Sequence, residues 1–369
     1  MNIETMIFAY LAICVSMILF NIVCIFTLER NDRKLERKSY GFEERVKEQF
    51  ARTAAGKHAD EGHGKYLAKK LKNLSNLMAF DETLERLSRE NPEDMSKYLS
   101  EILPVFIDLT VVYRKKNELK AAYLLYIIQK YNIVGNKRNQ MINDHLLYYV
   151  KKPNLYCREN ALKALYTTGD VFCVMQALKI LDESTVYHSP KLLTDGLLSF
   201  AGNHEELIKC IWESFADYSV DMKISLLNYI RFQSGKHCRH ILMLLQDTTQ
   251  DQEVHFVCIR YLGKYPFREA YPLLLDYVER EQERPWQYAA IAALALASYP
   301  GRETEEALKR RLHSSNWYVR MNASRSLEML GLNYLDLIDI FEGDDRYAGE
   351  ILRYQLDRRQ VMEKEDSEA

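Results

Sequence analysis

Small and apolar residues recur at a fixed interval through the C-terminal half of the chain. Six apolar positions follow one another at intervals of 32 or 33 residues, and a small or apolar residue stands four positions before each. The apolar positions are Leu165, Leu198, Ile230, Leu262, Leu294 and Leu327, and the preceding ones are Ala161, Thr194, Leu226, Cys258, Ala290 and Ala323. A period of this length is typical of stacked helical units rather than of one closed globule.

The pattern predicts that each unit is a pair of helices. The first helix carries the periodic positions. Glycine follows four residues later in three units, at Gly169, Gly202 and Gly331, where a helix end favours a left-handed residue. Second helices are expected at 170–181, 203–216, 236–247, 268–281, 303–313 and 333–341. A pair cannot bury its apolar stripes alone, so the pairs must stack on their neighbours.

The beginning of the chain predicts a membrane-spanning helix. Thr5 to Leu28 contains no charged residue, and a helix of these 24 residues would be about 36 Å long. That length crosses a hydrocarbon core of about 30 Å. A cleaved signal peptide is the alternative, but it requires a basic start and a small-residue cleavage site, which this segment lacks. We therefore expect residues 3–28 to remain as an anchor.

The flanking charges predict the orientation of that anchor. Basic residues follow the span directly and none precedes it; they are Arg30, Arg33, Lys34, Arg37 and Lys38. Because basic flanks stay on the cytoplasmic side, the N-terminus should lie outside and the rest of the chain in the cytoplasm. The same residues could touch anionic lipid headgroups, although Glu29, Asp32 and Glu36 weaken their field.

Pattern and composition together divide the chain into five segments. They are an anchor at 1–28, a charged stalk and hinge at 29–64, degenerate helical repeats at 65–153, six regular repeats at 154–341, and a capping helix with an acidic tail at 342–369. The hinge at 53–64 contains three glycines and no apolar periodicity. His58 and His63 should therefore be exposed to solvent.

Charge and cysteine content narrow the range of functions. The chain has 50 basic and 52 acidic residues, a net charge of −2, which gives no overall attraction to nucleic acid. Its seven cysteines are odd in number and scattered, so they are poor material for a disulfide framework. Cys173 and Cys238 stand at the same position of two repeats and should be small core residues.

Candidate chemical groups are few. His237, Cys238 and His240 form the densest set of metal-ligand types, but a zinc site needs four converging ligands and no second cluster is visible. His255 and Cys258 share a helix face as a nucleophile and base would, yet both occupy repeat positions. We expect no catalytic residue, no cofactor and no metal site.

A column of basic and polar residues stands seven positions before each apolar anchor: Arg158, Lys191, Lys223, His255, Gln287 and Arg320. Regularly spaced cations could follow a polyanion. The interpretation that we favour is structural, with each residue pairing with a neighbouring unit and fixing the stacking.

The first and last regular units share a frame that resembles a HEAT repeat. Asn154, Arg158 and Ala161 correspond to Asn316, Arg320 and Ala323, and Val319-Arg320 matches the short bacterial variety also found in phycobilin lyases. His255 and Gln287 depart from the basic position. The resemblance covers about 154–341 and implies an all-α, right-handed α-solenoid of helix pairs.

The expected function is a non-catalytic, membrane-anchored scaffold or adaptor that binds a protein partner at the cytoplasmic face. One setting is a membrane enzyme such as a polysaccharide glycosyltransferase. Second helices usually line the concave side of such stacks, and tyrosine and tryptophan favour interfaces. The candidate partner-binding residues are Glu205, Lys209, Trp212, Arg239, His240, Glu269 and Tyr271.

Two other interpretations stay open. The resemblance extends to enzymes and ligand binders of similar fold, namely bilin lyases and helical-repeat glycosylases of alkylated DNA, although a neutral, anchored chain disfavours both. A homo-oligomer is compatible with the scaffold, since Asn21 and the Ala12-x-x-x-Ser16 spacing could pack spans together.

Overall fold

The structure is a computed structural model, and it describes residues 3–90, 92–135 and 140–368. Within these ranges the chain forms 19 α-helices, with 78% of the residues helical and no strand. The all-α class that the periodicity predicts is therefore confirmed.

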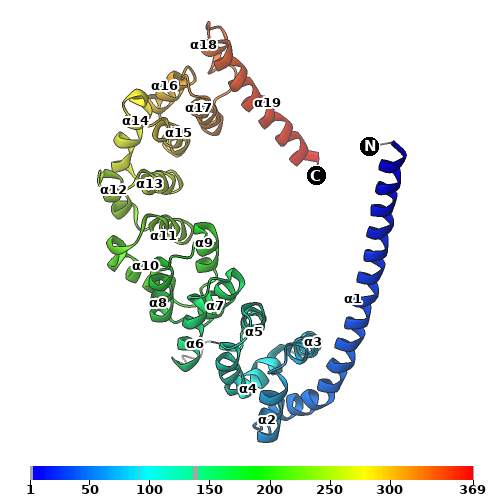
Figure 1. The fold of residues 1–369 in the computed structure, drawn as a ribbon. Coiled ribbons are helices and arrows are strands. Elements are labelled where there is room, and N and C mark those ends of the chain that lie inside the picture. Colours follow the sequence, from blue (N-terminus) through cyan, green and yellow to red (C-terminus); the bar gives the residue numbers. More distant parts are fainter. Residues whose placement is uncertain (1–2, 91, 136–139, 369) are drawn as a thin grey trace. The chain divides into compact units, whose positions relative to one another are not determined.

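The chain divides into two compact units. The first contains residues 1–187 and 199–203, and the second contains residues 188–198 and 204–369. The helices of the first unit are α1 (Ile3–Ala54), α2 (Glu61–Lys70), α3 (Leu74–Glu90), α4 (Pro92–Tyr113), α5 (Glu118–Lys130), α6 (Gln140–Val150), α7 (Leu155–Thr167) and α8 (Val171–Asp182) (Figure 1).

The second unit is also entirely helical within the described residues. Its α-helices are α9 (Pro190–Leu198), α10 (His204–Glu213), α11 (Val220–Gln233), α12 (Cys238–Gln246), α13 (Gln252–Lys264), α14 (Tyr271–Glu279), α15 (Trp286–Ala295), α16 (Arg302–Arg311), α17 (Trp317–Met329), α18 (Ile338–Phe341) and α19 (Arg346–Glu368). Four short 3-10 helices lie between these α-helices: η1 (Phe215–Asp217), η2 (Arg268–Ala270), η3 (Glu281–Glu283) and η4 (Leu296–Ser298).

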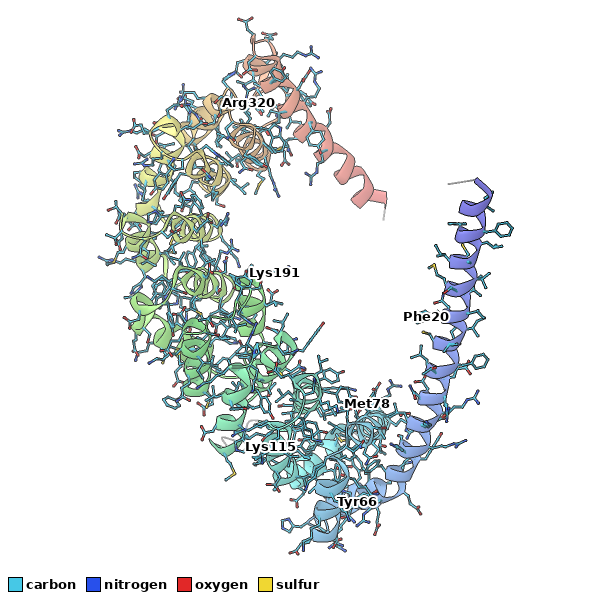
Figure 2. The ribbon with its side chains drawn as sticks, in the orientation of Figure 1. Phe20, Tyr66, Met78, Lys115, Lys191 and Arg320 are labelled. Carbon is cyan, nitrogen blue, oxygen red and sulfur yellow. The ribbon has the colours of Figure 1, made fainter. Side chains whose placement is uncertain are left out.

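The first part of α1 is apolar on all of its sides. Between residues 7 and 28 its large side chains are exposed, and Phe20, labelled in Figure 2, is 68% accessible. A helix that is hydrophobic all round and makes no packing contacts suits a lipid environment. Among the described residues, one helix is long and apolar enough to cross a membrane, and an N-terminal signal sequence has the same properties.

The second part of α1 belongs to the core of the first unit. Phe42, Val46 and Phe50 recur every four residues and are buried where α1 packs against α3 and α4. The hydroxyls of Ser39 and Thr83 add a buried hydrogen bond of 3.0 Å between α1 and α3. The charged stalk expected from the sequence is thus a packed helix.

His63 differs from its predicted exposure. It lies inside α2, is fully buried, and pairs its Nε2 with the hydroxyl of Tyr98 at 2.8 Å. His63, Leu67 and Leu71 follow one another at intervals of four residues, and all three are buried. The glycines beside His63 made this helical spacing difficult to recognise in the sequence. Burial, together with the nearby charge of Arg45, lowers the pKa of His63 to about 4.

Polar caps start the first helices where the repeat frame places them. Asn154 and Asn316 accept backbone N–H groups at the starts of α7 and α17. At their ends, Gly169 and Gly331 adopt positive φ values of 65° and 89°, as predicted. Gly202 does not adopt a positive φ. Glycine is required there because a Cβ would lie 2.4 Å from the carbonyl oxygen of Gly169.

Successive first helices pack directly on each other in the second unit, in the order α9, α11, α13, α15 and α17. In both units, the residues four positions before each anchor are buried, and four of the six anchors are buried as well. The closest approach is at Gly263 of α13, where a Cβ would lie 2.9 Å from both Cα and Cβ of Ala295. Small side chains therefore set the distance between neighbouring helices.

Polar side chains bond across these contacts to the backbone of the next helix. Asn322 of α17 donates to the carbonyl of Ala290 in α15 at 2.7 Å, and Ser326 donates to Ala293 at 2.8 Å. In the first unit, Asn160 of α7 donates to the carbonyl of Ala122 in α5 at 2.9 Å. Asn160 and Asn322 occupy the same position of the frame, so the register between helices follows from the repeat.

The contact at Gly263 predicts a specific sensitivity. Gly263→Ala should lower the free energy of unfolding by about 1–3 kcal/mol, because the methyl group meets backbone that cannot move aside. Gly349→Ala in α19 is the control: its Cβ would meet nothing closer than 3.9 Å. That change should raise stability by up to about 1 kcal/mol through helix propensity. Urea unfolding followed by circular dichroism measures both, and equal effects would contradict the close approach.

Buried His63 predicts an acid-dependent loss of stability. Its folded pKa of about 4 lies below the model-peptide value of 6.5, so the unfolded chain binds the proton first. The stabilisation is complete above pH 6.5 and is lost as the pH falls toward 4, by up to about 3 kcal/mol. Urea unfolding at several pH values should show a smaller loss in His63→Phe, and an unchanged loss in the control His58→Gln, whose side chain is 92% exposed.

Candidate functional site

The candidate residues from the sequence lie on one side of the second unit. The second helices α10, α12, α14 and α16 form a row on the side away from α19, and the first helices α11, α13, α15 and α17 form the row nearer to it (Figure 1). Packing of α17 against α19 is consistent with this arrangement. The second helices, which carry most of the candidate residues, thus lie on the side of this unit that is away from α19.

Trp212 and His240 are brought together at the junction of α10 and α12. Their rings stack with centroids 5.4 Å apart and an interplanar angle of 23°. The ring centroid of Phe215 lies 5.0 Å from that of Trp212. His237 adds a third ring contact to Trp212 at 6.0 Å. Burial, with His240 and Lys236 nearby, lowers the pKa of His237. The group is a half-buried aromatic contact between two helices.

The remaining candidates are dispersed around this contact. Glu205 forms an ion pair with Lys236, and Lys209 lies 4.0 Å from Glu213 on the same helix. Arg239 and Glu269 are exposed. Such exposed ion pairs contribute little to stability, so these charges remain accessible to a partner.

Tyr271 instead joins the next helix pair. Its hydroxyl donates to Glu303 at 3.3 Å and accepts from Thr304 at 3.1 Å, both in α16, and its ring stacks on Tyr299. The seven candidates are thus divided between an α10–α12 contact and an α14–α16 contact.

A more exposed aromatic group lies at the starts of α15 and α17. We define the aromatic cluster as Trp286, Trp317 and Tyr318. Trp286 and Tyr318 stack with centroids 5.1 Å apart at 13°, and Trp317 meets Tyr318 edge-on at 5.1 Å. The three side chains are 38%, 56% and 56% exposed. Contiguous exposed aromatics of this kind mark interaction surfaces in soluble domains.

The local sequence explains why these rings face solvent. Asn316 caps α17 by accepting from the backbone of Tyr318 at 2.9 Å, so Trp317 and Tyr318 occupy the first turn. The buried stripe begins only at Val319. The rings therefore precede the packed face.

Two further side chains, Arg320 and Tyr347, extend the aromatic cluster toward α19. Arg320, one turn after Trp317, places its guanidinium 5.9 Å from the ring of Tyr347, which is 73% exposed. Tryptophan, tyrosine and arginine are the residues that dominate the energy of protein interfaces. The sequence offered a signal for this group, since Trp286 and Tyr318 are one repeat period apart.

The two arginines of the basic column bond to the backbone of the preceding turns. Arg158 donates to the carbonyl of Lys152 at 3.1 Å, and Arg320 donates to that of Ser314; both acceptors stand six residues earlier. Arg320 also bonds Asp345 at 3.2 Å, near the start of α19. These guanidinium groups tie turns to neighbouring elements, in agreement with the structural interpretation.

His255 fills the same position of its repeat with different chemistry. Its Nε2 lies 3.0 Å from the carbonyl of Asp247, and its Nδ1 lies 2.8 Å from the hydroxyl of Tyr288 in α15. Cys258, four positions before its own anchor, is buried, and burial raises the pKa of its thiol to about 12. A thiol held protonated in this way is not a nucleophile.

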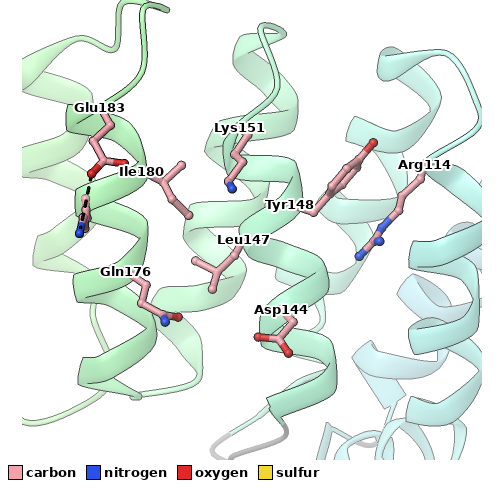
Figure 3. Close-up of a pocket in the computed structure, with 9 residues that line it drawn as sticks. Arg114, Asp144, Leu147, Tyr148, Lys151, Gln176, Ile180 and Glu183 are labelled. Atoms are coloured by element: carbon pink, nitrogen blue, oxygen red, sulfur yellow. Dashed lines mark ion pairs between the residues drawn. The ribbon is translucent and has the colours of Figure 1, made fainter.

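A hollow of about 500 Å³ lies between the ends of α4, α6 and α8 (Figure 3). Its lining mixes both charge signs with apolar groups: Arg114, Asp144, Leu147, Tyr148, Lys151, Gln176, Lys179, Ile180 and Glu183. Arg114 is engaged by the ring of Tyr148 at 4.3 Å, and Lys179 lies 3.8 Å from Glu183. We interpret the hollow as a solvated junction between helices.

In the described ranges, no group of three or more His, Cys, Asp or Glu side chains could hold a metal ion. His237 and His240 have ring centroids 6.3 Å apart, and the thiol of Cys238 is directed to the carbonyl of Gly235 at 3.3 Å.

Comparison with known proteins adds no family assignment. No protein-family model matches the chain, and no curated protein matches it.

The exposure of the aromatic cluster predicts that its rings are dispensable for folding. Trp317→Ser should change the free energy of unfolding by no more than about 0.5 kcal/mol, as expected for a surface site. Trp212→Ser should cost at least about 1.5 kcal/mol, because it removes a half-buried ring contact. Urea unfolding followed by circular dichroism compares the two. Comparable losses would show that the cluster is structural.

Proposed function

We propose that this protein is a non-catalytic scaffold or adaptor, anchored in a membrane by α1, that presents a HEAT-like α-solenoid to a protein partner at the cytoplasmic face. The observation that carries the proposal is the aromatic cluster of Trp286, Trp317 and Tyr318, exposed on a helical stack that needs none of these rings for its core.

The solenoid part of the proposal rests on the repeat frame. The direct packing of first helix on first helix within the second unit is what a stack of helix pairs requires. Equivalent asparagines bond equivalent backbone positions in both units. The resemblance to HEAT repeats, read from Asn316 to Ala323, accounts for both features.

The membrane part rests on the first half of α1. An apolar helix exposed on every side from residue 7 to residue 28 needs lipid around it. The basic residues from Arg30 to Lys38 favour a cytoplasmic location for everything that follows. Anchoring raises the effective concentration of the helical domain toward any membrane-embedded partner, so a modest surface can be sufficient for binding.

The aromatic cluster is the surface that we assign to the partner. Its rings are rigid and already stacked, so binding would order little that is mobile. Arg320 and Tyr347 extend it with a cation and a further ring. A membrane enzyme, such as a polysaccharide glycosyltransferase, is the class of partner that a membrane-confined adaptor would bind.

The test is affinity capture of the full-length chain from mildly solubilised membranes, with mass spectrometry of the retained proteins. The variant Trp286→Ser/Trp317→Ser/Tyr318→Ser is compared with a control that removes equally exposed apolar groups, Phe172→Ser/Met243→Ser/Leu335→Ser. We expect one membrane protein to be retained in near-equal amounts by the wild type and the control. The aromatic variant should lose it, because a hot-spot loss of at least about 2 kcal/mol weakens binding about 30-fold.

Other outcomes would overturn the proposal. Retention by all three chains would show that the cluster is not the binding surface. A coloured ligand in the purified protein would favour the bilin-binding alternative, and salt-dependent binding of DNA would favour the glycosylase-like one.

A further inference from the structure

A one-sided concentration of charge lies in the first unit, in a groove between the α2–α3 turn and the α4–α5 turn. The groove has a volume of about 620 Å³ and contains five lysines; its lining is Lys69, Lys70, Lys72, Asn73, Leu74, Ser75, Asn76, Met78, Lys116 and Lys120. Met78 is labelled on α3 in Figure 2. No carboxylate stands in this lining, in a chain whose net charge is −2.

The five lysines are not neutralised by the protein. Within the described residues none of them forms an ion pair with a carboxylate. Lys116 donates to the backbone carbonyl of Lys72 at 2.6 Å, which ties its ammonium to the α2–α3 turn. Lys69, Lys70, Lys72 and Lys120 are exposed. The groove therefore presents a positive field that an anionic ligand would complete.

Polar groups on the groove floor suit a phosphate. Asn73 caps α3 by accepting from the backbone of Ser75 at 2.9 Å, so α3 begins inside the groove. The positive end of that 17-residue helix adds to the lysine charges. Asn76 and Ser75 supply further polar side chains to the lining.

Lys38 connects the groove to the membrane-spanning helix. Its ammonium donates to the hydroxyl of Ser75 at 2.9 Å. Lys38 stands ten residues after Leu28, which corresponds to about 15 Å along α1. The headgroup layer occupies roughly 5–8 Å of that distance. The groove then lies within about one Debye length of the headgroups at physiological salt.

The juxtamembrane acids do not cancel this field, because the helix separates them from the lysines. At about 100° per residue, Asp32 and Glu36 lie within about 60° of Glu29, whereas Lys34 and Lys38 lie about 140° and 180° away. The acids share a different hollow, which Glu82 of α3 also lines. The side of α1 that faces the groove thus carries Lys34 and Lys38 rather than the acids.

We propose that the lysine groove binds the phosphate of anionic phospholipid headgroups and so docks the first unit on the membrane surface. The inference rests on the anchoring of α1 in the proposed function, and it adds a second, folded contact with lipid. Five cations carried by α2, α5 and the two adjoining turns select for anionic bilayers, which the apolar span alone does not.

The experiment uses the full-length chain in lipid nanodiscs and measures how fast an amine-reactive reagent modifies each lysine, by mass spectrometry. Discs of phosphatidylcholine are compared with discs that contain phosphatidylglycerol. We expect the modification of the groove lysines to slow by about fivefold in the anionic discs, the factor that corresponds to roughly 1 kcal/mol per lysine near an anionic surface. Lys163 and Lys209, exposed on α7 and α10, should be unaffected. High salt should remove the protection.

A charge variant provides the matched control. In Lys69→Gln/Lys72→Gln/Lys120→Gln, the protection of Lys70 and Lys116 by anionic lipid should fall at least severalfold. In Lys163→Gln/Lys179→Gln/Lys209→Gln, which removes the same charge elsewhere, it should be retained.

Three results would overturn the proposal. Equal modification in both kinds of disc would show that the groove does not meet lipid. Protection by millimolar inorganic phosphate in phosphatidylcholine discs, with no added effect of phosphatidylglycerol, would assign the groove to a soluble phosphate. Failure of the chain to enter nanodiscs would overturn the anchor itself, and this failure is distinguishable because no disc would co-elute with the protein.

Discussion

The close approach of neighbouring first helices is the constraint on which the rest of this structure depends. Gly263 against Ala295 leaves no room for a side chain, and the small residues Ala161, Ala290 and Ala323 are buried at a second position of the frame, four residues before their anchors. Because close-packed helices lose dispersion energy with even a small gap, small side chains at these contacts keep neighbouring helices close. Hydrogen bonds from Asn160 and Asn322 to neighbouring backbone then fix the register.

That packing decides which residues remain for function. In the first helices that a side chain caps, α7, α11, α13 and α17, the buried stripe begins at the third residue, so the first two side chains face solvent. In α17 those side chains are Trp317 and Tyr318, and Trp286 joins them from α15. Arg158 and Arg320 of the basic column are engaged by the backbone of the preceding turns, and Arg320 also by Asp345. This exposed aromatic surface is the feature on which the proposed binding of a partner protein rests.

The distribution of charge is a second product of the fold. The chain is almost neutral, and its lysines and carboxylates are interspersed in sequence. Folding gathers Lys72 and Lys116 from two turns that are 44 residues apart, while α1 turns Glu29 and Glu36 to its other side. The part of the first unit around the α2–α3 turn thereby acquires a positive field that the composition does not reveal.

The sequence by itself determined the helical class, the positions of the first helices and the one long apolar helix, because these depend on local periodicity and capping. Asn154, Asn316, Gly169 and Gly331 perform the local tasks that their positions indicate. Only the tertiary structure decided that His63 is buried, that Gly202 serves a close contact, and that the second helices lie away from α19. It also decided which lysines and which rings meet. Those outcomes depend on contacts between residues far apart in the chain, and a period along the sequence carries no information about the side of a helix that a distant segment will cover.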